Sequence, residues 1–590
     1  MCGIAGEIRF DQRPASLERV QRMTSVMRPR GPDGQGLVNY GRYAFGHRRL
    51  KIIDLSDRGQ QPMEDPMLGL TLVFNGCIYN HKELRQELEG KGYQFFSSSD
   101  SEVILKAYHH WGDHCVEHFN GMFAFVVYER DSGRVFMARD RLGIKPLYYQ
   151  KTPGVLRFAS SLPALIKGRR GSLDINPIAL HHYMMFHSVV PAPNTIIKGI
   201  SKLAPATTLT FEPYGTTRER KYWELDYDRE LDLRDETEIR NALLEQMRNA
   251  VSRRLVADVP VGVLLSGGVD SSLITALIAE HGVDGLQTFS VGFEDAGGEK
   301  GNEFDYSDIV AQYFGTTHHK IEVDSSTLLD NLEDCFKAMS EPMVSHDNIG
   351  FYMLSKHVAE HVKVVQSGQG ADEVFGGYHW YPPMLDTSQP LAEYRQAFFD
   401  REQNEYLDAV SEAYTEGSDV SLDFIREHFA MPGASHAVDK ALRLDTTVML
   451  VDDPVKRVDN MTMAWGLEAR VPFLDHELVE FAAAIPARYK VGHSGKHILK
   501  EASRQVIPSE VIDRPKGYFP VPALKYLEGD QLDFVRDILD NQAARNRGLF
   551  SKDYLDKLMS DPQAHITPLR GSKLWQVATL EYWLQTHAIE

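Results

Sequence analysis

The sequence predicts an α+β N-terminal half, followed by an α/β half with a doubly wound parallel sheet and a helical C-terminal part. Three observations predict this fold class. Residues 1–210 contain short β-type runs bounded by Gly, Asp, Asn or Pro, whereas strands alternate with helices from residue 236 onward. The last third of the chain is helical in pattern.

The N-terminal half is expected to hold two packed sheets with helices outside them. Its predicted helices cover residues 81–90 and 101–111. We assign residues 1–210 to this first domain. Its predicted strands cover residues 70–75, 122–130, 134–140 and 146–150.

A polar, charged stretch separates the two halves, and we predict that residues 211–235 form a linker. An amphipathic helix follows, because apolar residues from Ile239 to Leu255 recur at a spacing of three to four. Two further predicted strands, at 286–293 and 362–368, alternate with helices, which is typical of a parallel sheet. Residues 236–590 therefore form the second predicted domain.

The composition excludes several classes of partner. The 590 residues include 64 Lys and Arg against 83 Asp and Glu, a formal net charge of −19. This acidic excess argues against nucleic acid, because phosphate-binding surfaces need clustered basic residues. No apolar stretch approaches the roughly 20 residues of a membrane-spanning helix, and the N-terminus does not resemble a signal peptide. Four scattered cysteines are typical of a reducing compartment, so we expect a cytoplasmic protein with no membrane partner.

A cysteine at the second position is the first candidate catalytic residue. Removal of the initiator Met would give Cys2 both a thiol and a free α-amine. Since an α-amine titrates at a pH of roughly 8, it can serve as general base for the thiol beside it. By position alone, a chance residue in a strand remains the alternative.

The surrounding residues favour the catalytic interpretation. MCGIAG at residues 1–6 is followed by RGPDG (30–34), GHRRL (46–50), NGCIYN (75–80), SDSE (99–102) and RDRLGIKPLY (139–148). This order resembles the glutaminase domain of class II glutamine amidotransferases, and the match spans the first 200 residues. The resemblance implies a layered α/β/β/α domain in which an N-terminal nucleophile hydrolyses glutamine.

The same resemblance implies roles for five residues. Cys2 would attack the side-chain amide of glutamine, while the Asn75 amide and the Gly76 N–H would form the oxyanion hole. Arg49 would pair with the α-carboxylate of glutamine, for which a planar guanidinium is well suited. Asp100 would hold the α-ammonium.

A second constellation, SGGVDSS at residues 266–272, lies between a predicted strand and a predicted helix. Glycines let the backbone approach an anion, and the helix N-terminus donates to it. The string resembles the pyrophosphate-binding loop of ATP pyrophosphatases, which adenylylate a substrate and release pyrophosphate. Asp270 is a candidate Mg²⁺ ligand, because hard cations prefer carboxylate oxygens.

Together the two halves resemble the asparagine synthetase B family over nearly the whole chain. Further matching segments are SGQGADEVFGGY (367–378), RVDNM (457–461), EARVPFLD (468–475) and KHILK (496–500). The resemblance implies that Asp372 is a second Mg²⁺ ligand and that catalytic Lys496 contacts the phosphates or the acyl-adenylate. It also implies an ATP and pyrophosphate site formed by Leu265, Ser266, Gly267, Gly268, Asp270, Ser271, Ser272, Val291, Ser367 and Gly368.

Three positions depart from the family pattern. Cys77 stands where asparagine synthetases usually have a Glu that helps to hold the substrate ammonium, so glutamine binding should rest more on Asp100. Gln369 stands where Glu or Asp is usual, and a neutral amide cannot act as a general base. Residues 341–348 lack the Asp-Pro-Ser common in relatives. Gln369 and Asp347 are our candidate residues for the acceptor pocket.

The segment FHSVVPAP (186–193) is similar to bacterial enzymes that amidate N-acetylglutaminylglutamine. We therefore predict a ligase that takes ammonia from glutamine, adenylylates a small carboxylate with MgATP and makes N-acetylglutaminylglutamine amide. Asparagine synthetase is the first alternative, and a weakly active glutamine-sensing regulator is the second. The acidic charge disfavours a tRNA-modifying pyrophosphatase. The residues leave open whether the chain forms a homodimer.

Overall fold

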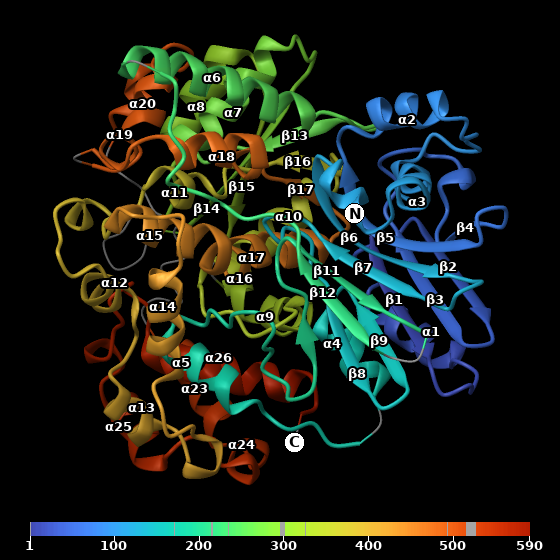
Figure 1. Ribbon diagram of the computed structural model, residues 1–590. Helices are drawn as coiled ribbons and strands as arrows, with labels where there is room; N and C mark the ends of the chain where they lie inside the picture. The colour runs from blue at the N-terminus through green and yellow to red at the C-terminus, as the bar shows by residue number, and fades with distance from the viewer. Residues whose placement is uncertain are drawn as a thin grey trace.

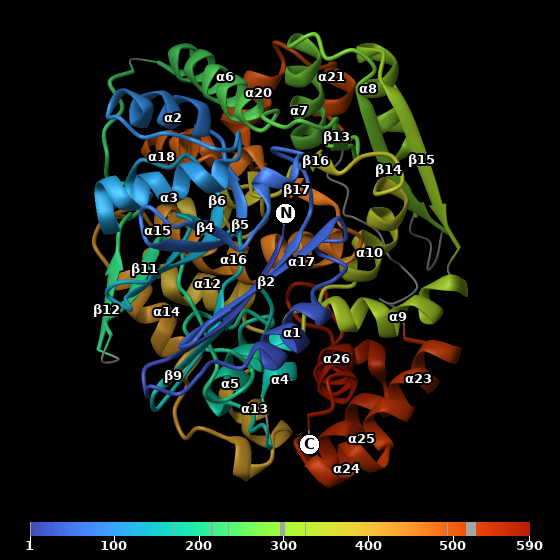
Figure 2. The same ribbon diagram turned by 90° about the vertical axis from the view of Figure 1, so that its right-hand side faces the viewer.

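The computed structural model describes residues 2–589 except 170, 214–215, 234, 295–300, 325, 493 and 515–526. Figure 1 shows an N-terminal domain, coloured from blue through cyan to green, lying against a larger domain. In Figures 1 and 2 the N-terminal end lies beside strand β17 (Glu468–Arg470) of the larger domain. The two domains therefore meet where the chain begins.

The N-terminal domain contains a six-stranded antiparallel sheet in the order β10-β8-β9-β1-β3-β2. Strand β1 is paired on both sides, so Cys2 directly precedes a strand that is held firmly in place. The strands are β1 (Gly3–Arg9), β2 (Gly34–Tyr40), β3 (Tyr43–Arg49), β8 (Tyr148–Thr152), β9 (Val155–Ala159) and β10 (Ser201–Lys202).

A second six-stranded antiparallel sheet has the order β12-β11-β7-β6-β5-β4. Its edge strand β12 lies inside the stretch expected to be a linker, and most of its residues are exposed. The sheet of the N-terminal domain therefore extends to residue 221. The strands are β4 (Met63–Asp65), β5 (Leu70–Ile78), β6 (Gly121–Glu129), β7 (Val135–Arg139), β11 (Thr207–Phe211) and β12 (Thr217–Lys221).

The two antiparallel sheets pack face to face, with helices on their outer sides. Ile4 of the first sheet and Val73 of the second belong to one buried apolar cluster. Leu84 and Val103, from helices α2 and α3, pack with Phe125 against the outer face of the second sheet. Helices α1 and α4 contact the first sheet. The outer helices are α1 (Leu17–Val26), α2 (His81–Gly90), α3 (Asp100–Trp111) and α4 (Leu162–Gly168).

The larger domain contains the predicted parallel sheet, in the order β15-β14-β13-β16-β17. The strand order reverses between β13 and β16, and doubly wound sheets bind ligands beside the carboxyl ends of the strands at this point. Ser266 and Ser367 follow these two strands. The first four strands are β13 (Val261–Leu264), β14 (Gln287–Phe293), β15 (Thr317–Val323) and β16 (Val364–Gln366).

Helix α6 (Glu236–Arg253) shows how local sequence defines an element of this domain. Asp235 caps its N-terminus by accepting hydrogen bonds from the N–H groups of Thr237 and Glu238, at 2.8 and 3.0 Å. Ile239 and Leu243 on one face are buried, as the amphipathic pattern predicted.

Helices surround the parallel sheet: α7 (Val269–Glu280) and α8 (Phe304–Phe314) contact it as one pair, while α10 (Asp347–Val358) and α17 (Pro454–Met463) form a second pair (Figure 2). None of the helices formed by the described residues combines the length and apolar character that crossing a membrane requires. The remaining helices are α5 (Pro177–Met185), α9 (Ser326–Ala338), α11 (Ala371–Phe375), α12 (Pro390–Phe398), α13 (Gln403–Ala409), α14 (Val420–Ala430), α15 (Ala437–Leu444), α16 (Leu450–Asp452), α18 (His476–Ala484), α19 (Ala487–Val491), α20 (His497–Ser503), α21 (Ser509–Ile512), α23 (Gly529–Asp540), α24 (Gln542–Arg547), α25 (Lys552–Ser560) and α26 (Lys573–Thr586).

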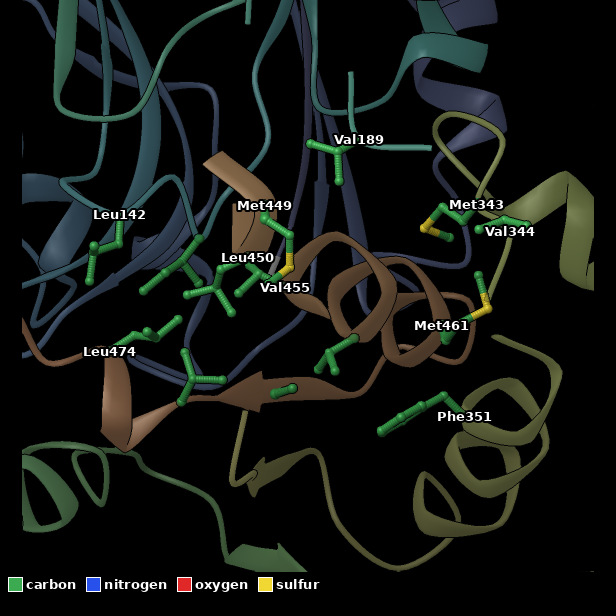
Figure 3. Close-up of a cluster of buried hydrophobic side chains, with 14 of the residues drawn as sticks. Leu142, Val189, Met343, Val344, Phe351, Met449, Leu450, Val455, Met461 and Leu474 are labelled. Carbon is green, nitrogen blue, oxygen red and sulfur yellow. The ribbon is translucent and has the colours of Figure 1, made fainter. Parts of the chain in front are cut away.

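Apolar side chains from both domains meet in the interior of the molecule. Leu142 of the N-terminal domain belongs to the same buried cluster as Leu450, Val455 and Leu474 of the larger domain (Figure 3). Burial of apolar surface stabilises such an interface by roughly 25 cal/mol per Å². An apolar core therefore joins the two domains.

Candidate active sites

Cys2 lies at the entry to β1, with 8% of its surface exposed. Its backbone N–H donates a hydrogen bond to Asn75 Oδ1 over 2.9 Å. Burial raises the pKa of the Cys2 thiol above its ordinary value, so thiolate formation needs a base at the site. Asn75 Nδ2 is buried and has no hydrogen-bond partner among the described residues. A buried, unpaired donor beside a nucleophile is suited to stabilising an oxyanion.

Gly76 follows Asn75 on β5, at a position that only glycine can occupy. A Cβ atom there would lie 2.1 Å from the carbonyl oxygen of Met122, and the φ angle of Gly76 is +154°. The backbone at Gly76 therefore packs closely against β6. Gly76 lines the same small cavity as Cys2.

Arg49 and Asp100 line this cavity from two other sides. Arg49 is held by the carbonyl oxygens of Asp54 and Ser56, the latter at 2.8 Å. Asp100 begins α3 and accepts a hydrogen bond from the N–H of Ile78 over 3.1 Å. Burial raises the pKa of the Asp100 carboxyl. The structure thus brings together the predicted residues Cys2, Arg49, Asn75, Gly76 and Asp100.

Cys77, Glu468 and Arg470 are among the other residues that line the Cys2 cavity. Cys77 is a buried free thiol. Glu468 and Arg470 lie on β17 of the larger domain, and neither was among the predicted site residues. Both belong to the EARVPFLD segment, whose match to the family was the one signal that pointed to them. The cavity is therefore completed across the domain boundary.

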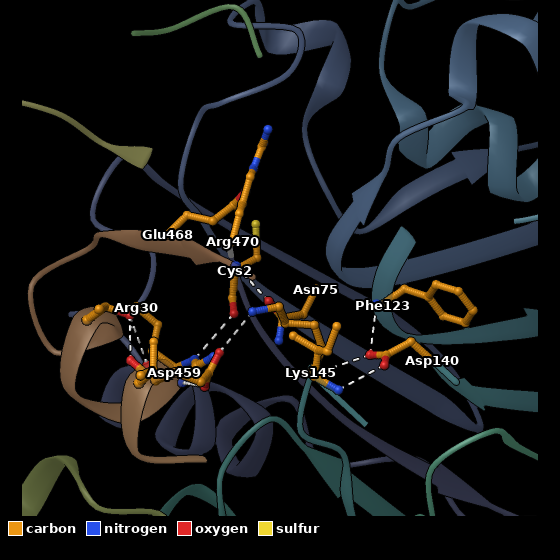
Figure 4. A network of polar contacts seen from close by, with 12 residues as sticks. Cys2, Arg30, Asn75, Phe123, Asp140, Lys145, Asp459, Glu468 and Arg470 are labelled. Atoms are coloured by element: carbon orange, nitrogen blue, oxygen red, sulfur yellow. Dashed lines mark hydrogen bonds and ion pairs between the residues drawn. The ribbon is translucent and has the colours of Figure 1, made fainter. Parts of the chain in front are cut away.

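A buried ionic network connects the nucleophile to helix α17. The Asp459 carboxylate lies 2.9 Å from Arg30 Nη1 and 3.2 Å from Lys145 Nζ, both of the N-terminal domain (Figure 4). Arg30 Nε also donates to the carbonyl oxygen of Cys2 over 3.4 Å. The position of Cys2 thus depends on contact between the domains.

A larger cavity opens at the strand reversal of the parallel sheet. The loop after β13 leads into α7, whose N-terminal N–H groups favour an anion in the cavity. Of the predicted ATP-binding residues, Leu265, Ser266, Gly268, Asp270, Ser271, Val291, Ser367 and Gly368 line this cavity.

The remaining two predicted residues, Gly267 and Ser272, support the loop from outside the cavity lining. Gly267 has a φ angle of +73°, and a Cβ atom there would lie 2.6 Å from the backbone N of Ser307. Glycine is therefore required for the loop to turn. Ser272 is fully buried within α7.

Lys496 lies between the two predicted metal ligands. Its Nζ atom is 2.6 Å from Asp270 Oδ2 and 3.0 Å from Asp372 Oδ1. Burial would lower the pKa of Lys496, but the two carboxylates outweigh burial and raise it. In the described part of the chain, no group of three or more His, Cys, Asp and Glu side chains could hold a metal ion. Two convergent carboxylates together with ATP phosphate oxygens would nevertheless suit Mg²⁺.

Gln369 and Asp347, the candidate acceptor residues, line the larger cavity together with Arg457. Arg457 Nη1 lies 3.3 Å from Asp347 Oδ2. Burial raises the pKa of Asp347 to about 6, although the Arg457 charge opposes this rise. Lining residues that we did not predict include Glu303, Phe304, Tyr378, Arg457, Lys500 and Arg514.

The fold and the two cavities define a two-domain amidotransferase, with an N-terminal glutaminase fold joined to a synthetase fold. The family model "Glutamine amidotransferase domain" matches residues 1–223, and the model "Asparagine synthase" matches residues 242–585. The chain belongs to the asparagine synthase family, and it is a glutamine-hydrolysing amidotransferase and ligase. ATP as a substrate is consistent with this membership.

Several relatives match along almost their whole length. Asparagine synthetase (glutamine-hydrolyzing) 1 of Bacillus subtilis (strain 168) is 30% identical, over 99% of this chain and 96% of that protein. Asparagine synthetase (glutamine-hydrolyzing) 3 of the same organism is 32% identical, over 100% and 99%. Amidase chry2 of Gibberella zeae is 26% identical, over 93% of each chain.

Proposed function

We propose that this chain forms an amide from a substrate carboxylate in three steps. The N-terminal domain hydrolyses glutamine to glutamate and ammonia. The larger domain transfers AMP from ATP to the carboxylate and releases pyrophosphate. Ammonia then displaces AMP and gives the amide. One observation carries the proposal: a single chain holds both the Cys2 cavity and the loop-lined cavity, and an apolar core joins its two domains.

At the glutaminase site, the Cys2 thiol attacks the side-chain amide of glutamine, and the freed α-amine of Cys2 accepts the thiol proton. Asn75 Nδ2 and the Gly76 N–H stabilise the oxyanion, and one such donor contributes about 3 kcal/mol. Arg49, oriented by two carbonyl oxygens, binds the α-carboxylate, and Asp100 binds the α-ammonium. Ammonia leaves, and water hydrolyses the thioester.

At the synthetase site, the loop from Ser266 to Ser272 and the N-terminus of α7 bind the phosphates that leave as pyrophosphate. Lys496, fixed by Asp270 and Asp372, donates to the phosphate oxygens. Mg²⁺, when bound by the same two carboxylates, supplies neutralisation of the phosphate charge. These groups hold the α-phosphorus of ATP next to the acceptor carboxylate.

We infer that the acceptor is N-acetylglutaminylglutamine. Gln369 presents a neutral amide that both donates and accepts hydrogen bonds, which suits an acceptor rich in amide groups. Asp347 is paired with Arg457, so its charge is already partly balanced. An N-acetylated acceptor has no α-ammonium that would need such a charge.

Asparagine synthesis is the second candidate function. The full-length relatives from Bacillus subtilis carry the name asparagine synthetase, and this supports aspartate as the acceptor.

An acceptor screen separates the two candidates. The enzyme is supplied with ATP, glutamine and either aspartate or N-acetylglutaminylglutamine, and the amide product is detected by mass spectrometry. We expect N-acetylglutaminylglutamine amide as the product. Asparagine as the sole product would refute our choice of acceptor.

The variant Cys2→Ala tests the division of labour between the domains. We expect it to lose glutamine-dependent synthesis, because Cys77, the second thiol of the cavity lining, has no free α-amine beside it and burial raises its pKa. Ammonia-dependent synthesis should stay within about twofold of wild type, since the synthetase cavity is unchanged. Pyrophosphate release with each nitrogen source is the measurement. Loss of both activities in a folded variant would contradict separate sites.

A further inference from the structure

The cavity around Cys2 contains two charged side chains that the mechanism above does not use. Glu468 and Arg470 stand two residues apart on β17, so their side chains point to the same face of that strand. They are almost fully buried, with 1% and 0% of their surface exposed. Figure 4 shows both beside Cys2, although β17 belongs to the sheet of the larger domain.

Arg470 is held in place by several contacts of its guanidinium. Nη1 donates to the carbonyl oxygens of Arg254 and Val256, each at 2.8 Å. Nε lies 2.6 Å from Glu468 Oε1, and Nη2 lies 3.8 Å from Cys77 Sγ. A guanidinium with this many fixed partners keeps its orientation. It therefore holds the Glu468 carboxylate at the cavity wall.

The charges around the cavity match a zwitterionic amino acid. Arg49 supplies a cation for an α-carboxylate, while Asp100 and Glu468 are the acidic side chains of the lining. Burial raises the pKa of Asp100, and the nearby Glu468 raises it further, although the charges of His81 and Arg470 oppose this rise. Burial would raise the pKa of Glu468, but the positive amino terminus and Arg470 lower it, so its carboxylate is ionised and attracts a cation that enters the cavity. The α-ammonium of glutamine is such a cation.

We propose, building on the glutaminase function proposed above, that Glu468 and Asp100 together bind the α-ammonium of glutamine. Glu468 thereby replaces, from the other domain, the carboxylate that is absent at Cys77. Arg470 acts as a positioning residue for Glu468. The larger domain thus completes the glutamine site.

Arg470 also connects the Cys2 cavity to the larger cavity. The backbone carbonyl of Arg470 accepts a hydrogen bond from the N–H of Ser367 over 2.9 Å. Ser367 lines the larger cavity, so one residue of β17 contacts both sites. Arg470 therefore links Glu468, which binds glutamine in this proposal, to Ser367 of the proposed ATP site.

The test compares two substrates with the full-length enzyme. Glutaramate has the same amide and carboxylate as glutamine but lacks the α-ammonium. Glu468→Gln should raise KM for glutamine by roughly 10- to 100-fold, because a buried charged partner is lost. Its kcat should change less than about threefold, and kcat/KM for glutaramate should stay near the wild-type value. An equal loss with both substrates, or an unchanged KM for glutamine, overturns the proposal.

A matched control separates ligand binding from the loss of a buried ion pair. Asp475 is also buried and lies 2.6 Å from Arg254 Nη1, but it is not part of the cavity lining. Asp475→Asn should lower Tm while leaving the ratio of kcat/KM for glutamine and glutaramate unchanged. If it changes this ratio as much as Glu468→Gln does, the ratio does not report binding by Glu468 and the proposal fails.

Rescue and binding measurements keep this proposal distinct from the proposed function. Cys77→Glu places a carboxylate next to Arg470 and should lower the KM for glutamine of the Glu468→Gln variant toward the wild-type value.

If wild-type enzyme hydrolyses no glutamine, the proposed function fails. Titration calorimetry then still tests the inference. It compares the affinity for L-glutamine of the Cys2→Ala variant with that of the double variant Cys2→Ala, Glu468→Gln. Equal affinity in these two variants overturns it.

Discussion

At the scale of single residues, Lys496 and its two carboxylate partners depend on a glycine. A Cβ atom at Gly377 would lie 1.9 Å from Asp372 Oδ1 and 2.4 Å from Lys496 Cε. Lys496 itself has a φ angle of +54°, in the left-handed region that L-residues seldom adopt. Tight packing and an unusual backbone therefore bring one ammonium and two carboxylates to one point of the cavity.

Asp372→Asn removes one of the two carboxylates proposed to hold Mg²⁺. We expect the Mg²⁺ concentration for half-maximal pyrophosphate release to rise by about 10-fold or more, because even indirect ligand changes have effects of this size. Glutamine hydrolysis should be unchanged and serves as the internal control. An unchanged Mg²⁺ dependence would show that Asp372 is not a ligand.

At the scale of elements, the π-helical turn η5 (Asp445–Met449) places a carboxyl group among aromatic donors. Tyr394 donates to Asp445 over 2.5 Å and Trp380 over 3.2 Å, and Tyr381 donates as well. Burial raises the pKa of Asp445 to about 6 in spite of these donors. The turn between α15 and α16 therefore contains an acid that resists ionisation.

This pKa predicts a dependence of stability on pH. The folded-state pKa of about 6 lies above the ordinary value of 3.8, so the folded state binds more protons between these values. The stabilisation is complete below pH 3.8 and is lost as the pH rises to about 6.

Asp445→Asn should abolish this part of the pH dependence. We expect the difference in unfolding free energy between wild type and variant to change by up to about 3 kcal/mol across that window. Denaturant unfolding at several pH values measures it. A constant difference from pH 4 to pH 7 would contradict the elevated pKa.

The elements and sites that could be predicted are those encoded by adjacent residues. The loop from Ser266 to Ser272 and the pair Asn75-Gly76 carry their chemistry within a few positions, so a motif is enough to find them. Strand β12 was missed because its charged sequence TRERK, exposed at a sheet edge, lacks an apolar face. Arg470 was missed because it lies 393 positions from Cys77, and only the folded domains bring the two together.

At the scale of the whole molecule, buried charged side chains of the two domains meet in three places. Asp459 binds Arg30 and Lys145 next to Cys2. Glu468 and Arg470 enter the Cys2 cavity. Lys202 of β10 lies 2.9 Å from Glu341 and 2.5 Å from Asp452 of the larger domain. In the mechanism proposed above, ammonia formed at one site reaches the other, so these contacts bear on how much of it is retained.

Asp459→Asn tests whether this contact couples the sites. The substitution leaves two buried cations with less counter-charge, which typically costs about 3–5 kcal/mol. We expect a lower Tm and, in glutamine-dependent turnover, more glutamate formed per amide, because a loosened interface loses ammonia to solvent. Ammonia-dependent synthesis at saturating ammonium should be retained.

The matched control is a second ion pair between the same domains that is exposed to solvent. Lys363 Nζ lies 2.8 Å from Asp33 Oδ2, with 42% of the lysine side chain exposed. Exposed pairs contribute about 0–1 kcal/mol, so Lys363→Ala should leave both Tm and the ratio of glutamate to amide near wild type. If Lys363→Ala raises this ratio as much as Asp459→Asn, coupling depends on charge anywhere along the interface. If neither variant raises it, the buried network beside Cys2 has no part in retaining ammonia, and the apolar core between the domains suffices.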